Sequence, residues 1–158
     1  CPLYWISVIY LNFAEAKAEM GSLTQDDLNN SINKLQARAG LPAMTTTPDA
    51  DPANNMGVSN LIWEIRRCRR CELIMDNWYR YWDLIRWHQL DKLDSTKYPN
   101  TMLGANVSNV PDCEEATKNG YIDASDAQIR TYEAKHYFYP IPTTQLTLNK
   151  NMKQNPGW

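Results

Sequence analysis

The 158-residue sequence has no long hydrophobic run and few of the motifs that mark common enzymes. No apolar stretch reaches the ~18 residues that a transmembrane helix needs. There is no G-x-S-x-G, no P-loop and no dinucleotide fingerprint, so none of these catalytic or nucleotide-binding sites is predicted. The net charge of -2 argues against a nucleic-acid binder that depends on phosphate contacts.

Histidine is also scarce, with only His88 and His136 present. Neither histidine lies at metal-ligand spacing from the C-x-x-C motif at residues 68–71, and a zinc site would need a second pair of ligands. We therefore expect no metal and no cofactor, and we interpret Cys68 and Cys71 as free thiols. A disulfide to Cys1 or Cys113 stays open, because an exported protein would permit it.

The aromatic residues are skewed towards those with polar tips, with nine Tyr and six Trp against two Phe. Such side chains suit wet binding surfaces, although they also fill cores with their tips at the surface. The hydrophobic fraction of 43% and the charged fraction of 22% are ordinary for a globular protein. The length predicts one unit over residues 1–158.

The segment from Asn60 to Leu90 organises the predicted fold. It contains no Gly or Pro, and its apolar residues recur at helical spacing, which predicts one long helix or a helix pair with a wide apolar face. Two adjacent rows form this face: Leu61, Ile65, Cys68, Glu72, Met75, Tyr79 and Trp82, and beside them Cys71, Ile74, Trp78, Tyr81 and Ile85. The expected bend is Asp76–Asn77, because Asn tolerates the left-handed conformation that ends helices.

Four arginines, at positions 66, 67, 69 and 70, crowd the first half of this segment. Unpaired, they would repel one another at helical spacing. We predict an ion-paired face against Glu15 and Glu19 of the first helix, and a pair between Glu64 and Arg67. An anion-binding site is the alternative. Further along, Asp83 is expected to be a structural carboxylate that bridges Arg80 or Arg86.

The N-terminal part predicts a helical hairpin. Residues 3–20 are apolar nearly all round, which is typical of a helix buried on most sides. Gly21 is a stop signal, and Thr24 with Asp27 forms a capping-box pattern for a second helix that Gly40 ends. Such a hairpin is similar to a tetratricopeptide unit.

The remaining segments contain most of the turn residues. Residues 41–59 and 91–120 predict loops, with short extended segments at 120–122 and 129–132. The tail at 150–158 predicts an extended chain that docks through Trp158.

The Arg/Trp-rich segment also resembles a family signature. RRxRRxELxxxxxxRYWDLIRW, from Arg66 to Trp87, is similar to the signature of the SusD/RagB family of outer-membrane nutrient-uptake lipoproteins. Three positions depart from that pattern: Cys68 where an acid is usual, Cys71 where a small aliphatic residue is usual, and Asn77 where Gly is usual. Four further stretches resemble the family: LNFAEAKAEMG at 11–21, INKLQARAG at 32–40, YPIP at 139–142 and QNPGW at 154–158.

The resemblance implies a mostly α, SusD-like fold with a tetratricopeptide-type hairpin, a long Arg/Trp-rich helix or helix pair, long loops and short β segments near the C-terminus. The chain, which begins at Cys1 with no starting Met, is expected to be the C-terminal portion of a longer protein. It would bind glycans, or peptides in some members, at the outer face of the outer membrane without cleaving them. A lipid anchor outside this segment and a SusC-like TonB-dependent transporter as partner are further implications.

Candidate ligand residues come from the polar loops, because loops on a rigid frame can present both aromatic faces and hydrogen-bonding groups to a sugar. The predicted ligand-binding residues are Tyr98, Asn100, Asn106, Tyr121 and Asp123. Two alternatives remain: a glycoside hydrolase-like enzyme that uses Asp83, and a helical protein-docking scaffold that binds no glycan.

Overall fold

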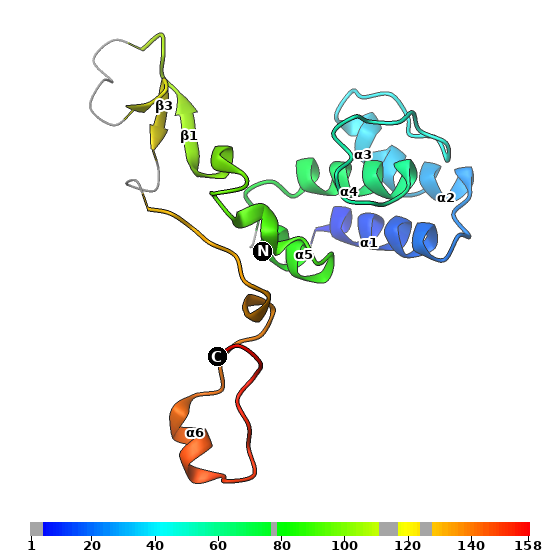
Figure 1. Ribbon diagram of the computed structural model, residues 1–158. Helices are drawn as coiled ribbons and strands as arrows, with labels where there is room; N and C mark the ends of the chain where they lie inside the picture. The colour runs from blue at the N-terminus through cyan, green and yellow to red at the C-terminus, as the bar shows by residue number, and fades with distance from the viewer. Residues whose placement is uncertain (1–4, 77–78, 111–116, 124–127) are drawn as a thin grey trace. The chain divides into compact units, whose positions relative to one another are not determined.

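The computed structural model describes residues 5–76, 79–110, 117–123 and 128–158, and it groups the chain into two compact units, Cys1–Trp82 and Asp83–Trp158. The chain is mostly helical with a few short strands, which confirms the predicted fold class (Figure 1). The tetratricopeptide detail stays a prediction, as does the treatment of residues 1–158 as one domain.

The first unit contains four helices: α1 (Ile6–Glu19), α2 (Gln25–Asn29), α3 (Ile32–Arg38) and α4 (Asn60–Glu72). The Thr24–Asp27 capping box is confirmed, since each side chain accepts a hydrogen bond from the other residue's backbone N–H. Gly21 and Gly40 end their helices at φ +67° and +68°, as predicted.

The predicted second helix is in fact two, separated at Asn30 and Ser31. The hydroxyl of Ser31 donates to the carbonyl of Asp27 at 2.6 Å. A serine hydroxyl that bonds a preceding carbonyl competes with the helical backbone ladder, which favours a break here.

Helices α1 and α4 pack side by side (Figure 1), and the first unit's core draws on all four of its helices. Its buried apolar members are Val8, Leu11, Ala14, Leu28, Ile32, Leu35, Met44, Ile65 and Leu73. Helix α1 is less buried than is typical for a helix that is apolar nearly all round, because Trp5, Ile6, Ile9 and Phe13 are between 41% and 58% exposed.

The loop at 41–59 is held by side chains that bond its backbone. Asn33 accepts from Met44 N at 2.7 Å through Oδ1 and donates to Met44 O at 3.1 Å through Nδ2. Trp63 Nε1 donates to Asp51 Oδ2 at 3.1 Å. Helices α3 and α4 thus hold the loop: Asn33 satisfies both backbone groups of Met44, and Trp63 bonds the side chain of Asp51.

The Arg/Trp-rich segment forms a helix pair and not one continuous helix. α4 ends at Glu72, Met75 takes a left-handed φ of 62°, and α5 (Tyr79–Arg86) follows. The helix thus ends before the predicted bend at Asp76–Asn77, and Asn77 itself lies outside the described residues.

This early ending disrupts the two predicted rows. Two members of these rows, Ile74 and Trp82, are 73% and 55% exposed. Two tryptophans outside the rows, Trp63 and Trp87, are each only 8% exposed. Helical spacing keeps residues on one face only while the helix continues. Trp78 lies outside the described residues.

The second unit holds short elements: η1 (Leu90–Leu93), η2 (Pro99–Met102), β1 (Leu103–Asn106), β2 (Thr117–Lys118), β3 (Tyr121–Asp123), η3 (Ala134–Tyr137) and α6 (Thr143–Leu148). The strands form one antiparallel sheet in the order β1-β3-β2. β3 confirms the extended segment predicted at 120–122, whereas residues 129–132 form no strand.

The C-terminal tail closes a loop through side chains that bond the backbone. Gln154 accepts from Ile141 N at 2.7 Å and donates to Ile141 O at 2.9 Å, and Asn155 Nδ2 donates to Tyr139 O at 2.6 Å. Trp158 Nε1 donates to Phe138 O at 2.9 Å, which confirms that Trp158 docks. We call Gln154, Asn155 and Trp158 the tail clasp.

Replacing Arg66 should destabilise the first unit much more than replacing Arg67. Arg66 bonds Glu15 at 3.1 Å and Glu19 at 3.0 Å, which confirms the predicted ion-paired face; its side chain is only 11% exposed. Arg66→Met leaves the buried Glu15 without this partner, so we expect a loss of about 3 kcal/mol in the free energy of unfolding.

The matched control is Arg67→Met, because Arg67 pairs with Glu64 of its own helix at 2.7 Å and its side chain is 42% exposed. A loss below about 1 kcal/mol is expected there. Urea unfolding followed by Trp fluorescence measures both. Equal losses would contradict the buried role of Arg66.

Weakening the tail clasp should expose the loop between residues 141 and 154 to protease. Gln154→Glu keeps an acceptor for Ile141 N but loses the donor to Ile141 O and places a carboxylate against that carbonyl. We expect trypsin to cut after Lys150 and Lys153 several-fold faster than in the parent chain, as measured by mass spectrometry. Gln145→Glu, which adds the same charge at an exposed position of α6, should leave the rate unchanged.

Candidate functional site

A tight turn at residues 94–98 positions the first two candidate residues. The buried carboxylate of Asp94 accepts hydrogen bonds from Thr96 N at 2.9 Å and from Tyr132 N at 3.2 Å, and its backbone carbonyl accepts from Tyr98 N at 2.8 Å. The Thr96 hydroxyl, followed by the Tyr132 backbone N–H, lowers the pKa of Asp94 to about 2. Asp94 thus joins this turn to the chain near Tyr132.

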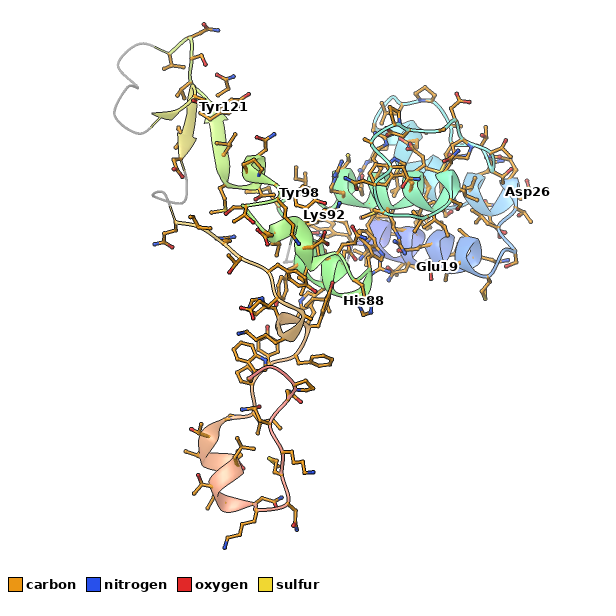
Figure 2. All side chains as sticks on the ribbon, viewed as in Figure 1. Glu19, Asp26, His88, Lys92, Tyr98 and Tyr121 are labelled. Carbon is orange, nitrogen blue, oxygen red and sulfur yellow. The ribbon has the colours of Figure 1, made fainter. Side chains whose placement is uncertain are left out.

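Tyr98 is half-buried and closely associated with Lys92. The ammonium group of Lys92 donates to Tyr98 Oη at 2.9 Å and lies 4.5 Å from the ring centroid (Figure 2). A cation at this distance is attracted to the ring's π face. The contact fixes the orientation of the ring and places a positive charge beside it.

Asn100 lies within η2, where its carbonyl accepts from Leu103 N. Its side chain is exposed to solvent. It can therefore offer an amide donor and acceptor to a ligand without first breaking a buried interaction.

Asn106 and Tyr121 face each other across the sheet. Their Cα atoms are paired in the register of β1 and β3. Asn106 Oδ1 accepts from Ser108 N at 3.0 Å, and Val107 N donates to Gly120 O at 2.8 Å. Gly120 is needed here, since its φ is +82° and a Cβ would lie 2.1 Å from Ser108 Oγ.

Asp123 lies opposite Leu103 in the same register. Tyr121 and Asp123 are two residues apart on β3, so their side chains share one face of the sheet. Figure 2 shows Tyr121 well away from Tyr98 and Lys92. The candidate residues therefore form two groups, one at η2 and one on the sheet, and not one pocket. Their role in ligand binding stays a prediction.

A second aromatic surface was not found by sequence reasoning. The ring centroids of His88 and Tyr137 are 5.0 Å apart in a tilted arrangement, and those of Tyr137 and Tyr132 are 5.7 Å apart. The ring centroids of His136 and Trp158 are 6.0 Å apart. Desolvation, reinforced by the hydrogen bond with Tyr137, raises the pKa of Tyr132 to about 12.

Beside this cluster, Phe138, Tyr139 and Trp158 are 53%, 69% and 47% exposed. The dense aromatics of HYFYPIP were a signal for this surface.

Asp83 is structural, as predicted. It is 3% exposed and accepts from Arg86 Nε at 2.9 Å. The guanidinium group of Arg86 also lies 4.7 Å from the ring of Trp87. A carboxylate in this setting holds the end of α5 and has little access to a substrate.

The C-x-x-C motif has one half-buried and one exposed member. Cys68 and Cys71 are both free thiols, and burial raises the pKa of Cys68 to about 12. Cys1 and Cys113 lie outside the described residues. Among the described residues, no group of three or more His, Cys, Asp or Glu is placed to hold a metal, and no helix is long and apolar enough to span a membrane.

Comparison with known proteins identifies the family. The model of the SusD family matches residues 2–158, and this chain belongs to that family. No curated protein sequence matches the chain.

Solved SusD-like structures share the fold. A SusD-like protein from Bacteroides fragilis matches with 25% identity and a TM-score of 0.62 over 96% of this chain. The protein named BT4246 matches with 26% identity and a TM-score of 0.62 over 99% of this chain. The chain spans 25% of the length of the first and 23% of the second.

The low pKa of Asp94 should make the second unit sensitive to acid. The pKa is about 2 in the folded chain against an ordinary 3.8, so Asp94 contributes stability that is fully present above pH 3.8 and lost as the pH falls through 2. Asp94→Asn should remove this part of the pH dependence, because the amide does not titrate. Acid titration between pH 5 and about 1.5, followed by Tyr and Trp fluorescence, checks it. Acid unfolding curves of equal steepness for the parent chain and for Asp94→Asn would refute the role of Asp94 in this pH dependence.

Proposed function

We propose that this protein binds glycans at the cell surface without cleaving them and passes them to a SusC-like TonB-dependent outer-membrane transporter. The observation that carries the proposal is the match of the SusD family model to residues 2–158. SusD-like proteins act as non-catalytic binding proteins of nutrient uptake and are typically outer-membrane lipoproteins. A lipid anchor outside this segment is part of the proposal.

The chemistry of the second unit supports a sugar ligand. Sugars present apolar C–H faces that stack on aromatic rings, and hydroxyl groups that bond amides and carboxylates. Tyr98 and Asn100 combine these groups within three residues of sequence, and the pairing of β1 with β3 places Asn106 beside Tyr121 and Asp123. Lys92 lies over the Tyr98 ring and donates to its hydroxyl oxygen, so the opposite ring face and the hydroxyl hydrogen are the parts offered to a ligand.

The two other hypotheses are weaker. A glycoside hydrolase needs two accessible carboxyl groups flanking the scissile bond, and Asp83 is buried and paired with Arg86. A docking scaffold without a ligand would make no use of the polar aromatic surfaces, but it would still associate with the transporter. The experiment below separates all three.

Affinity gel electrophoresis against a panel of soluble polysaccharides tests the proposal. We expect one or more glycans to retard the parent chain. Tyr98→Ala and Tyr121→Ala should each weaken that retardation about tenfold, because losing a stacking ring costs roughly 1–2 kcal/mol. Phe13→Ala is the control, since it removes an exposed ring from α1 in the first unit and should change nothing.

Two results would count against the proposed function, and a third would reject only the proposed sites. Retardation by no glycan, combined with capture of the transporter, would favour the docking scaffold. Release of reducing ends that Asp83→Asn abolishes would favour the hydrolase. Glycan retardation that neither tyrosine variant weakens would leave the family role in place and reject these two sites.

A further inference from the structure

We propose that Cys68 and Cys71 are a reversible dithiol–disulfide pair, a modification site in which Cys71 reacts first with a small organic disulfide and Cys68 closes the bridge. The inference is independent of glycan binding. It starts from the fact that both cysteines lie within the last turn and a half of α4 and line one cavity. These are also two of the positions at which the sequence departs from the family pattern.

The cavity gives the pair an environment that an isolated surface thiol lacks. Its volume is about 180 Å³, its apolar wall includes Leu11, Ile32 and Leu35, and Arg67 also lines it. A cavity of this volume can hold one organic substituent of a small disulfide next to the two thiols. Within the described residues, Cys68 and Cys71 are the cysteines that share this cavity.

The two thiols differ in a way that assigns the order of the steps. Cys71 is exposed and meets a reagent from solvent. Cys68 is half-buried, and Gln36 Nε2 donates to its sulfur at 3.1 Å. Cys71 is therefore the attacking thiol. Cys68 is the resolving thiol, and its attack is the slow step, because it must leave Gln36 and because burial raises its pKa to about 12 and keeps it protonated.

The helix geometry allows the bridge at a cost. Residues three apart on a helix have Cβ atoms about 5–6 Å apart, whereas a disulfide needs about 3.5–4.5 Å. Cys71 lies one residue before the end of α4, where a helix distorts most easily. The remaining strain makes the bridge easy to reduce, which is the property of labile disulfides.

The reaction balances with a small disulfide R–S–S–R as the oxidant. The Cys71 thiolate, its proton given to water, attacks one sulfur; a Cys71–S–S–R bond forms and R–S⁻ leaves and takes up a proton. Cys68 then gives its proton to water as its sulfur attacks Cys71, and the second R–S⁻ leaves and is protonated. The protein dithiol loses two electrons, and R–S–S–R is reduced to two R–SH.

Treatment of the full chain with hydroxyethyl disulfide tests the proposal. After the reagent is removed, mass spectrometry of the peptides should show the loss of two hydrogen atoms from the pair and no adduct retained on Cys68 or Cys71. Trypsin cuts after Arg69 and Arg70, between the two cysteines, so the bridge should appear as two peptides joined through Cys68 and Cys71. A mild thiol should restore the dithiol.

Single variants separate the two roles. Cys68→Ser should stop at the mixed disulfide on Cys71, and Cys71→Ser should lose the rapid first reaction. If a variant misfolds, the products formed by the parent chain alone still test whether Cys68 and Cys71 form a bridge. An adduct that persists on Cys71 in the parent, or a bridge from either cysteine to Cys1 or Cys113, overturns the proposal.

Discussion

The charge contact between α1 and α4 is the constraint on which the first unit depends. Arg66 reaches from α4 to both Glu15 and Glu19 of α1, and Glu15 is only 3% exposed. A buried carboxylate is costly without a partner, so the two helices are stable only in the register that brings these groups together. The apolar contacts of Leu11, Ala14 and Ile65 supply attraction, but they are less selective for one register than this pair.

Elsewhere, single side chains form the backbone hydrogen bonds that a sheet or a long helix provides in larger folds. Asn33 pairs with both backbone groups of Met44, and Gln154 does the same for Ile141. Asp94 joins a turn to the backbone of Tyr132. These amides and carboxylates satisfy backbone groups in segments with little regular secondary structure. Among them, Asp94 holds the turn that leads into Tyr98, one of the proposed ligand residues.

The parts of the fold that could be predicted from the sequence are those set by near neighbours. The Thr24–Asp27 cap and the helix stop at Gly21 follow from local spacing. The Arg66 pairing is long-range, and it was predictable because four crowded arginines need acidic partners. The end of α4 at Glu72 could not be predicted, because the nearest recognised turn signal was Asn77. Sheet register could not be predicted either, because the pairing of Asn106 with Tyr121 joins residues that are far apart in the sequence. This register determines which candidate residues lie together on the sheet.

The two hydrogen bonds between the Asn33 side chain and the Met44 backbone affect where this chain can accept an insertion. With Met44 fixed to α3 and Asp51 fixed to Trp63, the short span between those two points is tethered at both ends to the helical frame. Its length can vary at a small entropic cost, because closing a loop depends only weakly on its length. Foreign epitopes or reporter sequences grafted into 45–50 would inherit fixed endpoints, which makes this span the natural place to engineer the chain without disturbing its helices.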